Sequence, residues 1–194
     1  MILPGQLFLK TPQERDRTPF IAAMRSSRSY HHPWINGWTS DFAYDRYLLR
    51  AQEANQDLNL LCRRVDGAIV GFFNLGEIVH GALQSAYLGY GGIAQYRGHG
   101  YMSAGMQLLL ARAFTVLGLH RVEANIQPGN IPSLALVARS GFVKEGFSEA
   151  YLQINGQWRD HERWAIRAEQ WRALGGGTVG VRSGTGPANQ GQAL

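Results

Sequence analysis

Seven residues, 95–101 (QYRGHGY), have the composition of an anion-binding loop. Glycines at 98 and 100 let successive backbone N–H groups approach an anion, and the loop precedes a long amphipathic segment that starts at Tyr101. At a helix N-terminus the unpaired N–H groups and the helix dipole both favour phosphate. The pattern predicts a loop that cradles a pyrophosphate, although a Gly-x-Gly before a helix is also typical of a purely structural turn.

Two common phosphate-binding motifs are excluded by the residues that follow the loop. A P-loop needs Gly-Lys-Ser/Thr, which is absent, and a dinucleotide fingerprint needs a third glycine where Ser103 stands. The rest of the chain must therefore decide what the loop binds.

The elements around the loop follow from hydrophobic periodicity and from turn residues. Asp66-Gly67 and Asn155-Gly156 are hairpin signals, Ser40 precedes a helix, and Thr11-Pro12 with Glu14 resembles a capping box. Strands are predicted at 6–10, 58–65, 68–79, 86–93, 121–126, 144–154 and 160–166. Helices are predicted at 12–24, 41–54, 101–117 and 131–139, with an aromatic loop at 30–38. This order indicates a mixed α/β fold with a central sheet of about seven strands, not a doubly wound parallel sheet.

The composition indicates one domain, over residues 1–174, followed by a tail at 175–194. The chain has 194 residues, 45% of them hydrophobic, which suits a single core. The tail is rich in glycine and has no acidic or aromatic residue, so we expect it to be disordered. Apolar runs are too short to cross a bilayer and the start does not resemble a signal peptide, so we expect a cytoplasmic protein with no membrane contact.

The net charge of +5 suits an anionic ligand or partner. The arginines are spread along the chain instead of forming one block, so we do not expect direct nucleic-acid binding. The lone Cys62 has no neighbour at metal-ligand spacing and is interpreted as a buried strand residue.

The loop and a second motif together resemble the GNAT acetyltransferases. Gln95-x-x-Gly98-x-Gly100 matches the signature with which these enzymes hold the pyrophosphate of coenzyme A, and the predicted order of elements matches their fold. Asn130-Ile131-Pro132-Ser133 resembles the helix start that flanks the pantetheine arm. The segments YLGY (87–90), HPW (32–34) and YLQINGQWRDH (151–161) resemble the branch that acetylates the N-terminal alanine of ribosomal proteins.

The resemblance implies acetyl-coenzyme A as co-substrate, no metal, and a pair of splayed strands between which the pantetheine arm lies. The cofactor would be bound by two groups of residues: Ile93, Ala94, Gln95, Arg97, Gly98, His99, Gly100 and Tyr101, and Asn130 with Ser133. His99 would contribute its backbone N–H.

The catalytic groups are less clearly marked. Many GNAT enzymes place a tyrosine acid where this chain has Val137, which leaves Ser133, one helical turn earlier, as the candidate for a hydrogen bond to the coenzyme A sulfur. A residue that only caps the helix start is the alternative for Ser133. Glu77 is the candidate base, with Glu149 as another, and both are also typical of solvated surface carboxylates.

His32 and Trp34, with Trp158, are candidates for lining the acceptor entrance. Loop histidines are more often surface residues, and tryptophan more often belongs to a core or its rim. Three functions stay open: an N-terminal acetyltransferase acting on a protein such as a ribosomal protein, a small-molecule amine acetyltransferase, and a catalytically silent acyl-coenzyme A-binding module. The oligomeric state is not indicated.

Overall fold

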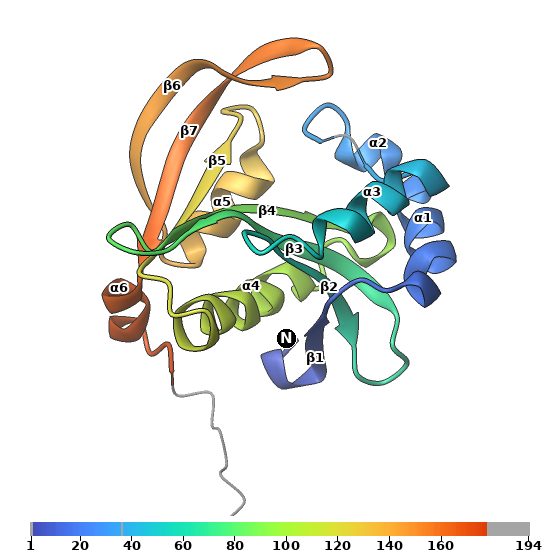
Figure 1. Ribbon diagram of the computed structural model, residues 1–194, viewed down its shortest axis with the longest axis horizontal. Coiled ribbons are helices and arrows are strands. Elements are labelled where there is room, and N and C mark those ends of the chain that lie inside the picture. Colours follow the sequence, from blue (N-terminus) through green and yellow to red (C-terminus); the bar gives the residue numbers. More distant parts are fainter. Residues whose placement is uncertain (1, 36, 178–194) are drawn as a thin grey trace, which may run out of the picture.

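A seven-stranded sheet lies at the centre of the fold, and the helices pack against it (Figure 1). The computed structural model describes residues 2–35 and 37–177. The strand order is β1-β2-β3-β4-β5-β7-β6. All neighbours are antiparallel except β4 and β5, which are parallel. The strands are β1 (Leu7–Lys10), β2 (Asp57–Arg63), β3 (Ile69–Val79), β4 (Ser85–Gly92), β5 (Arg121–Ile126), β6 (Val143–Ile154) and β7 (Gln157–Arg167). The mixed sheet predicted from the sequence is confirmed.

The parallel pair in the middle of the sheet separates soon after it forms. Only three residues of β4, from Ser85 to Tyr87, pair with three residues of β5, from Arg121 to Glu123. Both strands then continue, β4 to Gly92 and β5 to Ile126, while β5 stays paired with β7 along the whole length of β5. The expected splayed pair is therefore present, and it divides the sheet into two halves.

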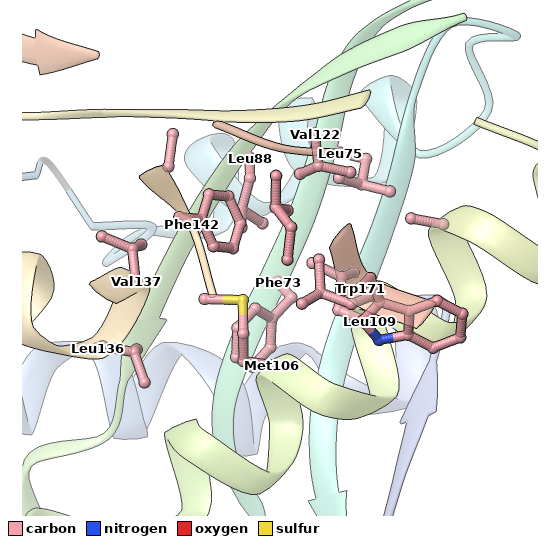
Figure 2. Packing of buried hydrophobic residues seen from close by; sticks show 14 of the residues in the cluster. Phe73, Leu75, Leu88, Met106, Leu109, Val122, Leu136, Val137, Phe142 and Trp171 are labelled. Atoms are coloured by element: carbon pink, nitrogen blue, oxygen red, sulfur yellow. The ribbon is translucent and has the colours of Figure 1, made fainter. Parts of the chain in front are cut away.

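Helices cover both faces of the sheet and enclose two hydrophobic cores. On one face lie α4 (Tyr101–Ala111), which continues into a π-helical turn at Arg112–Val116, and α5 (Ile131–Arg139). Met106 and Leu109 of α4 pack against Phe73 and Leu75 of β3 (Figure 2). The short α6 (Ala168–Ala173) adds Trp171 to this core.

The other face is covered by α1 (Arg17–Ser26), the four-residue α2 (Arg28–His31) and α3 (Asp41–Arg50). Their core is aromatic: Phe20 stacks on Tyr47 at 5.6 Å between ring centroids and meets Phe72 of β3 edge-on. The hydroxyl of Tyr47 donates to Asn74, which satisfies two buried polar groups at once. Cys62 is buried in this core, as expected.

Several boundaries differ from the predicted ones because a nearby side chain other than the predicted cap binds the chain at the helix start. The helix predicted from Pro12 starts only at Arg17, after a 3-10 turn at Glu14–Asp16, because Asp16 accepts from the Gln13 N–H and pairs with Lys10. The predicted capping box at Thr11 is therefore wrong. Ser40 does cap α3, accepting from the Ala43 N–H.

The remaining differences concern short elements. The predicted loop at 30–38 contains the end of α2, and α3 ends four residues before position 54. The last strand begins at 157 instead of 160, and α6 was not predicted. Most of the predicted tail, residues 178–194, lies outside the described residues. No helix within residues 2–35 and 37–177 is both long and apolar enough to cross a membrane.

α4 approaches the sheet closely at Gly105, and this contact generates a prediction about stability. A Cβ there would lie 2.6 Å from Leu61 and 2.7 Å from Phe73. We expect Gly105→Val to lower the free energy of unfolding by about 1–3 kcal/mol, because the fully buried core cannot absorb the added volume. Gly89→Val is the control, since a Cβ at Gly89 meets nothing within 4 Å. Urea unfolding of both variants checks this; equal stabilities would contradict a tight helix–sheet contact.

Candidate active site

A cavity of about 440 Å³ lies beside the part of β4 that has separated from β5. The other walls come from the loop that leads into α4 and the first turn of that helix, from α5, from residues 30–35 at the end of α2, and from Val70 of β3. The cavity therefore joins segments that are far apart in the sequence, and each segment is fixed by one of the two cores.

The loop before α4 presents a helix N-terminus to the cavity. The chain leaves β4 through Ile93, makes a 3-10 turn at Ala94–Tyr96, and passes two glycines with positive φ, Gly98 at +82° and Gly100 at +85°. Gly100 is the N-cap of α4, and no side chain caps this end. The first N–H groups of α4 are therefore available to an anion, and the helix dipole adds a favourable potential.

Positive side chains surround this helix start. Arg97 and Arg139 both line the cavity, and of the described lining residues none is Asp or Glu. Arg97 lies 5.9 Å from the centre of the Tyr30 ring, a cation–π distance. The site is electrostatically suited to a ligand with several negative charges.

The N-terminus of α5 brings a hydroxyl group to the opposite wall. Asn130 caps this helix, because its side-chain oxygen accepts from the Ser133 N–H at 3.3 Å. The Ser133 hydroxyl is thereby spared from capping and lies 2.5 Å from the hydroxyl of Tyr90 on β4. Burial raises the pKa of Tyr90 to about 12, so its phenol stays protonated at neutral pH. Val137, one turn after Ser133, is fully buried in the core and cannot offer a polar group.

Eight of the residues singled out from the sequence meet in this cavity. They are Trp34, Ile93, Arg97, Gly98, Gly100, Tyr101, Asn130 and Ser133. Ala94, Gln95 and His99 belong to the same loop but do not line the cavity, and the last two are exposed. Nδ1 of His99 lies 3.0 Å from the Arg97 carbonyl oxygen, a contact that is local to the loop.

The candidate base and two candidate entrance residues do not line the cavity. Glu77 is exposed on β3, four strand residues from Phe73, which pairs with the lining residue Tyr90, a separation of about 13 Å along the strand. Glu149 is exposed on β6. His32 is exposed beside the cavity segment, and Trp158 is 63% exposed on β7. The β6–β7 turn nonetheless reaches the 32–34 loop, because Asn155 donates to the Pro33 carbonyl at 3.3 Å.

The fold brings three further groups to this region: Tyr90 and Asn125, which sequence reasoning missed, and His31, which was considered only as the neighbour of His32 at the acceptor entrance. Tyr90 lines the cavity, and its position in a strand of alternating burial was the available signal. His31 is buried in the lining, where its Nε2–H donates to the Gly92 carbonyl at 2.8 Å. On the separated part of β5, the side-chain oxygen of Asn125 is buried without a hydrogen-bond partner in the described chain, so it can accept from a bound amine or amide.

Comparisons with known proteins agree with this geometry. A family model described as an acetyltransferase (GNAT) domain matches residues 6–143. Over 103 residues the chain is 37% identical to the [ribosomal protein uS5]-alanine N-acetyltransferase of Escherichia coli, and the match covers 53% of each chain. The chain thus spans about half the length of the curated relatives it matches.

Two solved structures extend the likeness to nearly the whole chain. RimJ of Mycobacterium smegmatis, in complex with CoA-disulfide, superposes with a TM-score of 0.77 at 28% identity, covering 88% of this chain and 90% of that one. Mutant forms of the spermidine/spermine N-acetyltransferase SpeG of Vibrio cholerae superpose with a TM-score of 0.72 at 18% identity, covering 88% and 99%. The second likeness shows a shared fold alone.

His31 generates a prediction about pH. Burial lowers the pKa of His31 below its ordinary value of 6.5, so below that pH the unfolded chain binds more protons than the folded one. Stability should therefore fall as the pH falls from 7 to 5. His31→Gln, whose amide can still donate to Gly92, should weaken this fall, whereas His80→Gln, at an exposed histidine, should not.

Urea unfolding at pH 7 and pH 5 checks the prediction. His161, whose pKa burial also lowers, contributes with the same sign in every variant, so the fall should shrink without vanishing. An unchanged fall in His31→Gln would contradict a neutral, buried His31.

Proposed function

Because the chain belongs to the GNAT acetyltransferase family, we propose that it transfers the acetyl group of acetyl-coenzyme A to a primary amine, the N-terminal α-amine of a ribosomal protein. One observation carries the proposal: an uncapped helix N-terminus and the Ser133 hydroxyl face the same cavity beside the separated part of β4.

The cofactor would be held by backbone groups and arginines. Its pyrophosphate would accept from the N–H groups around Gly98, Gly100 and Tyr101, with Arg97 and Arg139 as counter-charges. Its pantetheine arm would lie along β4 between Leu88 and Ile93, where the β5 side of the strand forms no ladder. The pantetheine arm would then meet the apolar wall along β4, and the phosphates would meet the positive end of α4.

The reaction needs little beyond positioning. A neutral amine attacks the thioester carbonyl carbon, a C–N bond forms, and the C–S bond breaks with the electron pair leaving on sulfur. An α-amine has a pKa of about 8, so about a tenth is neutral at pH 7, and the released proton can pass to water. Glu77 does not line the cavity, and we assign it no step.

Ser133 would stabilise the departing sulfur. Its hydroxyl is free of helix capping, and it stands one helical turn before the core residue Val137. A single hydrogen bond made mainly in the transition state lowers the barrier by an amount that changes the rate about ten- to a thousandfold.

The acceptor is proposed from chemistry and likeness. The E. coli relative is named for the alanine of a ribosomal protein, and its match includes half of this chain. A polyamine acceptor would call for acidic side chains, and the described cavity lining has arginines instead. A ribosomal acceptor would also place the protein in the cytoplasm. A small amine is the second candidate acceptor, because the spermidine/spermine N-acetyltransferase SpeG shares this fold.

The phosphate loop generates the first functional prediction. Gly100→Val forces a β-branched residue into a positive φ at the α4 N-terminus, and we expect the affinity for coenzyme A to fall at least about tenfold. Gly118→Val is the matched control, because Gly118 also has a positive φ and open space around it but lies at the other end of the helix. Calorimetry with coenzyme A should find normal binding in the control. Unchanged binding in Gly100→Val would overturn the assignment of the loop.

The identity of the acceptor generates the second functional prediction. Thiol release from acetyl-coenzyme A should be fastest with peptides that begin with alanine, slower with those that begin with serine, and slowest with spermidine and other small amines. Exclusive turnover of small amines would replace the peptide acceptor with the second candidate. Binding of coenzyme A without turnover of any acceptor would instead indicate a silent acyl-coenzyme A-binding module.

A further inference from the structure

Tyr90 is a half-buried side chain in the cavity that the proposed reaction has not used. It stands on β4, 43 positions before Ser133, and its phenol oxygen lies 2.5 Å from the Ser133 hydroxyl oxygen and 3.3 Å from the Ser133 carbonyl oxygen. Its ring stacks on Phe73 at 5.8 Å between centroids. The phenol is thus held by the core on one side and by the α5 N-terminus on the other.

Each of the two hydroxyl groups carries one proton, and the direction of the hydrogen bond between them decides whether the Ser133 proton can point into the cavity. If Tyr90 donates to the Ser133 hydroxyl oxygen, the serine proton is free to point into the cavity. If Tyr90 donates to the Ser133 carbonyl oxygen instead, the phenol oxygen of Tyr90 can accept the proton of the Ser133 hydroxyl, which then points away from the cavity. The 2.5 Å contact between the two hydroxyl oxygens occurs in both arrangements, whereas the bond to the carbonyl oxygen, which only the second arrangement needs, is long at 3.3 Å. The distances therefore favour the first arrangement.

We propose that Tyr90 is a positioning residue, which donates to the Ser133 hydroxyl and so turns the serine proton toward the sulfur that leaves during acetyl transfer. The inference rests on the proposed function and names a second residue for that same site. No covalent bond forms or breaks in this step, because both hydroxyl groups keep their protons and only their orientation changes.

Tyr90 does not act as an acid that gives up its proton. A thiol has a pKa of about 8.5, so a thiolate is a much weaker base than the tyrosinate of a phenol whose pKa burial raises to about 12. The phenol therefore remains a donor throughout the pH range in which an α-amine reacts. A chain of two hydrogen bonds, Tyr90 to Ser133 to sulfur, is strengthened by the low dielectric of its surroundings.

The purely structural alternative is that Tyr90 only joins β4 to α5. Tyr90→Phe distinguishes the two, since it retains the ring that stacks on Phe73 and removes only the hydroxyl. Tyr87→Phe is the matched control: Tyr87 lies on the same strand, is 44% exposed, and does not line the cavity.

The experiment is a double-mutant cycle of Tyr90→Phe and Ser133→Ala, with kcat, the KM for acetyl-coenzyme A and calorimetric binding of coenzyme A measured for each. We expect Tyr90→Phe to lower kcat about three- to thirtyfold and Ser133→Ala about ten- to a thousandfold, with KM and affinity unchanged within about twofold. The double variant should be no slower than Ser133→Ala alone, because Tyr90 acts through the serine. Tyr87→Phe should retain the kcat of the unmodified chain.

Three results would overturn the inference. Tyr90→Phe could retain full kcat, the two losses could multiply in the double variant, or Tyr90→Phe could raise KM and weaken coenzyme A binding while kcat stays normal. The last result would establish the structural alternative. If the unmodified chain turns over acetyl-coenzyme A, each of these results counts against Tyr90 alone. If it binds coenzyme A but turns over no amine, the proposed function and this inference fail together.

Discussion

The separation of β4 from β5 is the constraint on which the rest of the structure depends. Backbone N–H and C=O groups inside a protein need partners, and a strand in the middle of a sheet normally finds them in its neighbours. β4 pairs with β3 along its length but with β5 over only three residues. The fold must therefore provide another occupant for this edge, and the cavity beside it is where an extended, amide-bearing ligand can lie.

Two independent cores hold the sheet open at this point. On one face α4 and α5 pack on β3, β4 and β5, and on the other the aromatic group around Phe20 and Phe72 supports α1 and α3. Each core fixes one wall: α4 and α5 present their N-termini, and α2 brings His31 onto the last carbonyl of β4. Because both helix starts are anchored by buried side chains, the glycine loop and the serine hydroxyl are positioned before any ligand arrives.

The charges follow the same division. Several arginines are occupied by structural ion pairs, such as Arg112 with Asp57 and Arg121 with Glu123 and Glu145. Arg97 and Arg139 instead border the cavity, next to the positive end of the α4 dipole. A net charge of +5 therefore does not act as one basic patch, and its local distribution at the helix start matters more than its sum.

The sequence by itself determined the features whose causes are local. Gly98 and Gly100 before an amphipathic segment identify a helix start that can bind an anion, and Asn130 followed by Ser133 identifies a capped helix, because all the groups involved lie within a few residues. The hairpin turns could be predicted for the same reason, and the order of helices and strands along the chain followed from hydrophobic periodicity.

Only the tertiary structure decided which side chains meet across elements. Glu77 and Trp158 had the right chemistry for a base and an entrance residue, but neither lines the cavity, and only the pairing of the strands showed this. Tyr90 and Ser133 are 43 residues apart and share a hydrogen bond solely because β4 and α5 flank the same opening. The period of a strand says which face a residue occupies, whereas its partner depends on the packing of the whole chain.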